Sequence, residues 1–351
     1  MKKQCRIQKV NVRSVDLSGS PTVISTFAGC GGSSLGYQMA GFRELLAVEW
    51  DDNAVETFRL NFPDVPVYHG DIAALTSERC MKLAGIKARE LDVLDGSPPC
   101  QGFSTAGKRK FDDPRNSLFR EFARLVKDLQ PRVFVMENVT GMVKGCMKQA
   151  YLTIIAELRA CGYRAKGEVL NAMYFNVPQS RERVIIIGVR EDIGIEPSHP
   201  KPQGKPITAR SAVSGVINKT FNRPLATVAT AIWNTVKPGQ NGNHYRPGYY
   251  INSLKVDPNK PMPTIPKVCS GTGGHMHWDE RRTLTIEEIK RGTSFPDSFI
   301  FKGKFVQQWE QIGNCVPPNL MKAVAEHVRS EVLTCKSKKV KRGKAEVLES
   351  T

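Results

Sequence analysis

The chain has 351 residues, of which 40% are hydrophobic, and its 51 Lys and Arg against 34 Asp and Glu give a formal net charge of +17. This length can bury one large core and a smaller second domain. No apolar run approaches the ~20 residues that a membrane-spanning helix needs, and no signal-peptide pattern opens the chain, so we expect a cytoplasmic protein without a membrane partner. The nine cysteines form no Cys-x-x-Cys pair, which argues against a disulfide framework and a structural zinc site. The excess of positive charge favours a polyanionic partner, most often nucleic acid.

Basic residues gather at both ends of the chain. Five lysines and arginines precede the first acid, Asp16, and residues 336–344 hold six more. Such runs are typical of disordered segments that rest on phosphates, with a solubilising tail as the alternative. We therefore expect a basic N-terminal arm over residues 1–20 and a basic disordered tail over residues 336–351.

The first ordered unit is predicted to be a strand, a glycine-rich turn and a helix. Residues 23–27 read as the strand, the turn contains Gly29, Gly31 and Gly32, and a helical pattern begins at Ser33. This arrangement brings the backbone close to a nucleotide-like ligand and points free amides of the helix N-terminus at it. A glycine-rich turn alone is weak evidence, so the units that follow decide whether it binds a ligand.

The next two predicted strands also end in polar or aromatic residues. Residues 44–48 form a strand that ends in Glu49, and Trp50 beside it offers a flat face for an adenine ring. A third strand, residues 65–69, leads to Asp71. An acid after the second strand is typical of ribose binding in dinucleotide folds. Since the chain has neither a Gly-x-x-x-x-Gly-Lys-[Ser/Thr] loop nor a full Gly-x-Gly-x-x-Gly, the pattern favours S-adenosylmethionine over ATP or NAD.

The stretch with the clearest chemistry is residues 96–104, Gly-Ser-Pro-Pro-Cys-Gln-Gly-Phe-Ser. It follows a short buried strand, residues 91–95, at the edge where open α/β sheets bind ligands. The two prolines before Cys100 fix the backbone and leave the thiol little freedom. A small buried hydrophobe is the ordinary interpretation of a single cysteine, but this position and its small or polar neighbours favour a nucleophile.

An acid and two arginines adjoin later strands. Glu137 directly follows the apolar strand 132–136, where burial would raise the pKa of a carboxyl and suit it to proton donation; a helix cap is the alternative. Arg181 and Arg183 stand two positions apart before the strand 184–189. Side chains at this spacing point the same way on a strand, so we expect a two-pronged cationic face, with a solvated charge pair as the alternative.

Residues 191–280 change character and hold half of the 22 prolines. Weak alternation over residues 225–233 and 248–254 predicts short strands in a small domain of loops and strands, suited to an irregular polymer. His275 and His277 lack further ligands at metal-binding spacing, so we predict no metal site.

The last part regains regular patterns. Thr285 and Glu288 have the spacing of a capping box at the start of a helix, and an apolar stripe predicts a further helix over residues 319–333. We therefore divide the chain between its two basic ends into a catalytic and cofactor-binding domain, residues 21–190, a small target-recognition domain, residues 191–300, and a segment that returns to the catalytic domain, residues 301–335.

With these segments in order, the sequence resembles the DNA cytosine-5 methyltransferase family, especially its compact bacterial and phage modification enzymes. The likeness covers residues 20–190 and 280–333. Its motifs are Phe-Ala-Gly-Cys-Gly-Gly at 27–32, Gly96 to Ser104, Glu-Asn-Val at 137–139, Gln-Ser-Arg-Glu-Arg at 179–183, Arg-x-Leu-Thr at 282–285 and Gln-Ile-Gly-Asn at 311–314. The resemblance implies a Rossmann-like S-adenosylmethionine-dependent methyltransferase sheet with helices on both faces, plus a small, mostly β and loop, target-recognition domain.

The resemblance also implies a role for individual residues. Cys100 resembles the nucleophile, Glu137 the acid that holds cytosine N3, and Arg183 the cation that faces the base; Arg181 or Arg183 would raise the thiolate fraction. Gln101 and Ser104 are expected near the flipped nucleotide and its phosphate. The S-adenosylmethionine site is expected at Phe27, Gly29, Gly31, Glu49, Trp50, Asp71, Ile72, Pro99, Leu118 and Asn314.

Three departures from the family pattern stand out. The family usually has Asp-Leu where this chain has Ser25 and Thr26, and Ser where it has Cys315. A Leu-Gln-Gly-Phe-Pro pattern is replaced by Gly-Thr-Ser-Phe-Pro at 292–296. The first two affect packing more than chemistry, and the third concerns how that segment docks.

The implied reaction transfers a methyl group from S-adenosylmethionine to C5 of a cytosine flipped out of double-stranded DNA, through a covalent Cys100 adduct at C6. We expect a monomer that serves as the modification enzyme of a restriction-modification system, where a cognate restriction endonuclease acts on the same site, or as an orphan or phage methylase.

Three other interpretations compete with this one. A tRNA-type C5 methyltransferase shares the fold, but its Cys-Phe-Thr signature is absent here. A cysteine hydrolase needs a histidine beside Cys100, and the nearest one upstream, His69, ends another strand. A catalytically silent nucleic-acid-binding protein would not need both Cys100 and Glu137.

Overall fold

A computed structural model describes residues 19–99, 117–143, 148–217, 224–269 and 274–334. The predicted nucleophile Cys100, its neighbours Gln101 and Ser104, nearly all of the predicted arm 1–20 and the predicted tail 336–351 lie outside these residues.

A seven-stranded sheet forms the centre of the molecule, in the order β3-β2-β1-β4-β5-β8-β6. The first five strands of this order are parallel, and β8 runs antiparallel to both of its neighbours. The strands are β1 (Thr22–Thr26), β2 (Arg43–Glu49), β3 (Val67–His69), β4 (Val93–Gly96), β5 (Val133–Val139), β6 (Tyr163–Asn171) and β8 (Glu182–Arg190).

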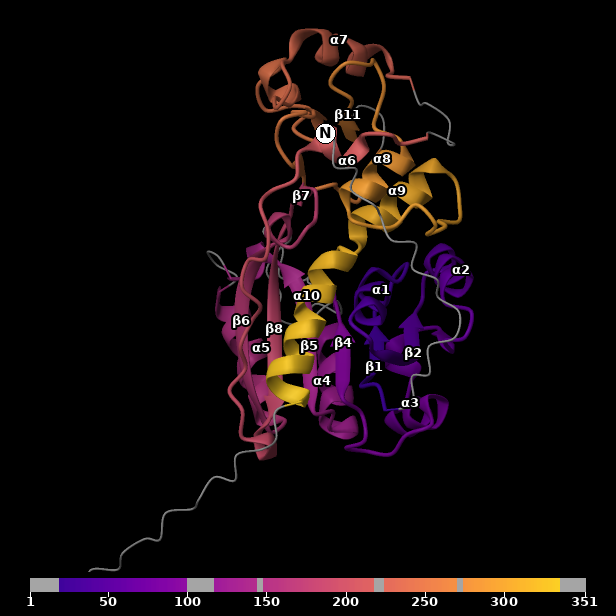
Figure 1. Ribbon diagram of the computed structural model, residues 1–351, viewed down its shortest axis with the longest axis vertical. Coiled ribbons are helices and arrows are strands. Elements are labelled where there is room, and N and C mark those ends of the chain that lie inside the picture. Colours follow the sequence, from indigo (N-terminus) through magenta and orange to yellow (C-terminus); the bar gives the residue numbers. More distant parts are fainter. Residues whose placement is uncertain (1–18, 100–116, 144–147, 218–223, 270–273, 335–351) are drawn as a thin grey trace, which may run out of the picture.

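Helices cover both faces of this sheet (Figure 1). Alternate residues of the central strands enter two separate cores: Val133 and Val135 of β5 pack on one face, while Phe134 and Met136 pack on the other. Strands buried on both faces read as continuous apolar runs, which is why their sequence pattern was clear. The helices of this part are α1 (Gly32–Met39), α2 (Asp52–Asn61), α3 (Ser77–Ala84), α4 (Ser117–Leu129), α5 (Lys148–Ala160) and α10 (Pro318–Val328). The predicted α/β fold class is confirmed.

Helix α10 comes from the end of the chain and packs directly against α1. The two helices approach closely because Gly36 of α1 has no side chain: an added Cβ would lie 2.7 Å from the carbonyl oxygen of Pro318 and 2.7 Å from Cβ of Met321. Helix α1, which follows the predicted glycine turn of the cofactor site, is therefore held in place by a segment almost 300 residues away in sequence.

The elements above the sheet in Figure 1 are short. Strand β7 (Gln179–Ser180) pairs with β10 (Met262–Pro263), and β9 (Ser253–Lys255) pairs with β11 (Gly274–Met276). The helices here are α6 (Ala209–Val213), α7 (Thr227–Thr235), α8 (Ile286–Gly292) and α9 (Phe305–Asn314).

The strand predicted at residues 225–233 is wrong, because this segment forms helix α7. Ala229 and Ile232 are its buried residues, and their spacing of three places them on one face of a helix. The alternation of threonine with apolar residues suggested a strand period, but the burial follows the helical one.

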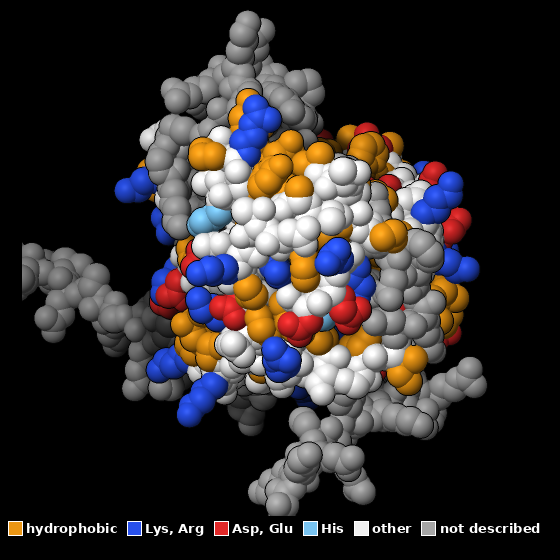
Figure 2. All heavy atoms as spheres, turned by 90° about the horizontal axis from the view of Figure 1, so that it is seen from above, with side chains coloured by type: hydrophobic (Ala, Val, Ile, Leu, Met, Phe, Trp, Pro, Cys, Tyr) orange, Lys and Arg blue, Asp and Glu red, His pale blue; other side chains and the backbone are white. Residues whose placement is uncertain are grey.

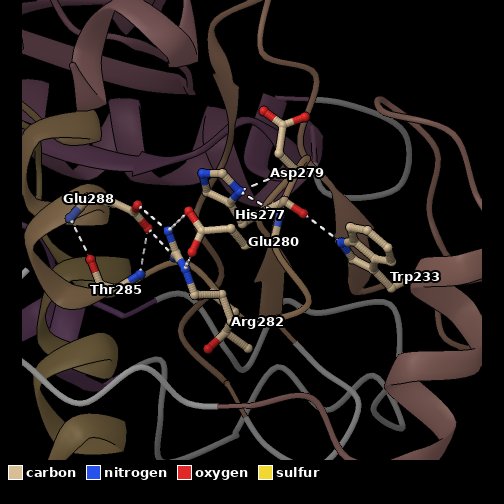
Figure 3. A network of polar contacts seen from close by, with 8 residues as sticks. Trp233, His277, Asp279, Glu280, Arg282, Thr285 and Glu288 are labelled. Atoms are coloured by element: carbon tan, nitrogen blue, oxygen red, sulfur yellow. Dashed lines mark hydrogen bonds and ion pairs between the residues drawn. The ribbon is translucent and has the colours of Figure 1, made fainter.

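A buried ion pair joins the chain before α8 to α8 itself (Figure 3). The Arg282 guanidinium donates to both carboxylate oxygens of Glu288, at 2.7 and 2.8 Å, and to Glu280 at 2.8 Å. Glu288 also completes the predicted capping box, since its carboxylate accepts from the Thr285 amide at 2.8 Å while its own amide donates to the Thr285 hydroxyl.

The same turn reaches α7 through His277 (Figure 3). Its Nδ1 accepts from the amides of Asp279 and Glu280, each at 3.1 Å, and its carbonyl oxygen accepts from Trp233 Nε1 at 2.7 Å. One continuous set of polar contacts therefore links α7, the turn 277–282 and α8.

We expect Arg282→Met to destabilise the protein by about 3 kcal/mol or more, because it leaves the buried Glu288 carboxylate without its partner. Urea unfolding measures the change. Arg164→Ala is the control: its ion pair with Glu196 is exposed on the surface, and such pairs contribute at most about 1 kcal/mol. Equal effects of the two substitutions would contradict this prediction.

Two acids, the buried Asp95 and the half-buried Glu44, lie beneath α1 without a cation beside them in the part of the chain that the structure describes. Asp95 of β4 is 2% exposed and accepts from the Tyr37 hydroxyl at 3.3 Å, while Glu44 of β2 accepts from the Ser34 hydroxyl at 3.0 Å. Burial and then the charge of Glu44 raise the pKa of Asp95 well above its usual range, and burial raises the pKa of Glu44 to about 7.

These raised pKa values predict a loss of stability with rising pH. The folded chain holds protons that the unfolded chain releases, so the contribution is full below about pH 4 and is lost as the pH rises through the folded pKa values. We expect Glu44→Gln to reduce the fall in Tm between about pH 4.5 and pH 7, the interval between the ordinary and the raised pKa of this carboxyl. The exposed Glu56 supplies the control, Glu56→Gln; a wild-type slope in Glu44→Gln would refute the assignment.

Candidate active site

The glycine turn after β1 has a backbone that few residues adopt. Phe27, Gly29 and Gly31 have φ of +54°, +55° and +95°. At Gly31 an added Cβ would also lie 2.4 Å from the ring of Phe62. The turn therefore requires glycine both for its left-handed backbone and for its packing against α2.

Glu49 at the end of β2 holds this turn. Its Oε2 accepts from the Gly29 amide at 2.7 Å, and its Oε1 accepts from the amides of Trp50 and Asp51 at 2.8 and 2.9 Å. The carboxylate is nearly buried, with 8% exposure. Oε2 has one donor here and keeps a second lone pair, so Glu49 can also accept from a ribose hydroxyl.

Trp50, Asp71 and Ile72 lie at the neighbouring strand ends. The Trp50 ring is 77% exposed, which leaves its face free to stack. Asp71 is exposed and caps a short turn by accepting from the Ala73 amide at 2.9 Å, while Ile72 is buried. This edge offers an aromatic surface, an acid and an apolar floor, which fits an adenosyl group.

The other predicted cofactor residues lie on different elements. Phe27 and Leu118 of α4 pack against the same apolar core. Pro99 is exposed after β4, and Asn314 is exposed at the end of α9. The chain following Asn314 touches the glycine turn, since an added Cβ at Gly32 would lie 2.3 Å from the carbonyl oxygen of Val316.

Glu137 and Arg183 form an ion pair at the end of β5. The distance from Arg183 Nε to Glu137 Oε1 is 2.8 Å, and the two side chains are 14% and 10% exposed. In the register of the two strands Glu137 lies opposite Ile185, so Arg183 is its diagonal neighbour. The guanidinium also donates to the Glu182 carbonyl at 2.7 Å, which fixes it beside the acid.

Asn138 is a residue of this site to which the sequence analysis gave no role. Its buried side-chain amide donates to the Pro98 carbonyl at 2.9 Å. This bond ties the chain two residues before Cys100 to the residue after Glu137. The signal was present in the sequence, because a polar amide directly after a buried strand needs a partner.

Arg181 does not form a free cationic face with Arg183, so that prediction is wrong. Arg181 is 2% exposed and donates to the Gly313 carbonyl at 3.0 Å. Its amide donates to the Gln179 carbonyl at 3.1 Å, so the chain bends here and strand alternation does not apply. Burial, and then the charge of Arg183, lower the pKa of Arg181 to about 10.

His275 and His277 both hydrogen-bond to backbone groups. His275 Nε2 lies 3.1 Å from the Thr264 carbonyl, and burial lowers the pKa of His275 to about 4. Within the described residues no three His, Cys, Asp or Glu side chains are placed to share a metal ion. No helix in the same residues is long and apolar enough to cross a membrane.

The mostly parallel sheet, the glycine turn and the acid that ends β2 define the class: an open α/β methyltransferase that uses S-adenosylmethionine. A solved structure with this fold is that of a candidate DNA modification methyltransferase encoded within a prophage of Escherichia coli. It has a TM-score of 0.75 and 24% identity, and the match covers 90% of this chain and 100% of the other.

Sequence comparisons give the family. The model of the C-5 cytosine-specific DNA methylase family matches residues 21–330. The chain is 37% identical to the Type II methyltransferase M1.HphI of Haemophilus parahaemolyticus, over 88% of this chain and 87% of the relative. It is 33% identical to the Type II methyltransferase M.DdeI of Desulfomicrobium norvegicum, over 87% and 88% of the two chains. The chain belongs to the C-5 cytosine-specific DNA methylase family and is a DNA (cytosine-5) methyltransferase.

We expect Trp50→Ala to weaken S-adenosylmethionine binding about tenfold, the effect of losing one stacked ring. Stability should change little because the ring is exposed. Isothermal titration with S-adenosylmethionine measures the affinity. Tyr249→Ala removes an aromatic ring that is 52% exposed and lies in the chain before β9, and it should leave this affinity unchanged. Unaltered affinity in Trp50→Ala would exclude the stacking role.

Proposed function

We propose that the enzyme methylates a cytosine within a specific double-stranded sequence through a covalent bond between Cys100 and C6 of the extruded base. The observation that supports this most is the Asn138–Pro98 hydrogen bond next to the Glu137–Arg183 pair. It brings the chain that leads to Cys100 to the side of a buried acid and cation.

The chemistry follows from the weak nucleophilicity of cytosine C5. Addition of the Cys100 thiolate to C6 breaks the aromatic system, while Glu137 holds the proton at N3 and stabilises the charge that develops there. Arg183, fixed by Glu137, faces the base. When bound, S-adenosylmethionine would supply an electrophilic methyl group to C5 of the adduct and leave as S-adenosylhomocysteine. Transfer of the C5 proton to a solvent base and expulsion of the thiolate from C6 then restore the aromatic ring and free the enzyme.

Extrusion of the base explains the need for a second part of the protein. Reaction at C5 and C6 is impossible inside a stacked duplex. We propose that residues 21–190 carry the chemistry, that residues 191–300 read the DNA, and that residues 301–335 return to the first part. Figure 2 views the end of the molecule formed by the small domain, where basic side chains are spread among hydrophobic, uncharged and acidic ones.

The names of the relatives suggest the setting. M1.HphI and M.DdeI are Type II methyltransferases, so we propose a modification enzyme in the cytoplasm of a bacterium or a phage-infected cell, acting as a monomer. A cognate restriction endonuclease would cut the same site. Methylation of DNA of known sequence followed by bisulfite mapping identifies that site, and labelled S-adenosylmethionine offered with tRNA tests the RNA alternative.

We expect the wild-type enzyme to form a stable adduct with DNA that contains 5-fluorocytosine at the target position, because fluorine at C5 cannot leave as a proton does. Cys100→Ser should form none, since a hydroxyl is a far weaker nucleophile than a thiolate. Denaturing gel electrophoresis detects the adduct. Cys161→Ser changes a different, half-buried thiol and is the control. An adduct of Cys100→Ser as abundant as that of the wild type would exclude the covalent mechanism.

A further inference from the structure

Three segments meet beside the active site: β7, the chain 262–265 that begins with β10, and the end of α8 at Thr293. Strand β7 lies against β10, with the Met262 amide donating to the Pro178 carbonyl at 2.9 Å. Gln179, fully buried, donates to the Thr293 hydroxyl at 3.4 Å, and its side-chain carbonyl accepts from the Ile265 amide at 3.5 Å. The segment that precedes Arg181 is therefore fixed between β10 and α8.

The Arg181 side chain connects these segments to the end of α9. One of its terminal nitrogens donates to the carbonyl of Gly313, and the other lies 3.5 Å from the carbonyl of Ile265. Gly313 belongs to the last turn of α9, whose carbonyls have no partner within the helix and favour a cation. The Arg181 Nε is buried and has no partner in the part of the chain that the structure describes.

Little space remains around these carbonyls. An added Cβ at Gly313 would lie 2.5 Å from the carbonyl oxygen of Pro266, so the end of α9 and residues 265–266 are in close contact with each other. The residue after Gly313 is Asn314, which is predicted to contact S-adenosylmethionine. Two residues after Arg181, in turn, Arg183 contacts Glu137.

We propose that Arg181 is a positioning residue that fixes Asn314 and the small-domain segment 262–266 relative to the Glu137–Arg183 pair, and that it does not contact the base. This inference rests on the proposed function, which places the flipped cytosine at Glu137. It replaces the catalytic role that the sequence suggested for Arg181. Its loss should weaken binding of S-adenosylmethionine and DNA and spare the chemical step.

Arginine suits this place better than lysine. Its planar fork reaches two carbonyls on different segments, whereas a lysine ammonium concentrates its charge at one point. Arg181→Lys can keep the bond to Gly313 and lose the one to Ile265, so we expect its binding defects to be intermediate between those of wild type and Arg181→Met.

The test compares Arg181→Met with Arg183→Met, since the two arginines differ in their partners. For Arg181→Met we expect the Kd for S-adenosylmethionine, measured without DNA, to rise about tenfold, the effect of one lost charge-assisted hydrogen bond. Its single-turnover rate at saturation should stay within about threefold of wild type. Arg183→Met should lose about a hundredfold in that rate and keep the Kd. A slow single turnover with unchanged Kd in Arg181→Met would overturn the proposal.

Gly313→Ala provides a second test that leaves Arg181 intact. The added methyl group displaces the carbonyl that Arg181 holds, so we expect the same rise in Kd with an intact single-turnover rate. Thermal unfolding and circular dichroism establish that each variant folds; if Arg181→Met does not, Arg181→Lys and Gly313→Ala decide. An unchanged Kd in the folded variants overturns the proposal. Because the Kd is measured without DNA, failure of the proposed covalent mechanism would appear separately, as a wild-type enzyme that forms no adduct.

Discussion

The contact between Arg183 and Glu137 depends on β8, the strand of the central sheet that runs antiparallel to both of its neighbours. The strands from β3 to β5 are parallel, so their carboxyl ends share one edge, where Glu49 and Glu137 lie. Strand β8 runs antiparallel to β5, and its beginning, not its end, therefore reaches this edge. A parallel β8 would put Arg183, which lies near its beginning, at the opposite edge of the sheet, away from the acid. The antiparallel direction of β8 therefore places Arg183 beside Glu137 within the sheet itself, and no loop is needed to position it.

The two halves of the site are held by different means. The cofactor half is held by backbone groups. Glu49 accepts hydrogen bonds from three amides, and the glycine turn has φ values that residues with a side chain rarely adopt. The half around Glu137 is held by side chains: the Glu137–Arg183 ion pair and the hydrogen bond from the Asn138 side chain to the Pro98 carbonyl. Substitutions at the first half therefore distort the chain path, whereas substitutions at the second leave the path intact and change the chemistry.

Local patterns predicted what is local and missed what depends on distant partners. The strand ends, the glycine turn and the capping box at Thr285 each depend on a few neighbouring residues, and they were predicted from the sequence. Helix α7 was mistaken for a strand because its apolar and threonine residues fit both periods, and only packing against β11 and its neighbours selects the helix. The partners of Arg181 lie 84 and 132 residues away, and a bend at that residue removes the alternation on which the prediction rested. The surroundings of Cys100 were predicted from motif resemblance, and they lie outside the described residues.

The family pattern places an aspartate where this chain has Ser25, and the structure indicates how the chain accommodates the change. In the pairing of β1 with β4, Ser25 lies directly opposite Asp95, and both are buried. A carboxyl is thus present in the same layer, moved by one strand. Asp95 hydrogen-bonds to Tyr37 of α1, on the face of the sheet where α1 and α10 pack. Asp95 pairs with Val135, two residues before Glu137 and on the same face of the sheet, but it is buried beneath α1. The departure at Ser25 therefore concerns how α1 is supported.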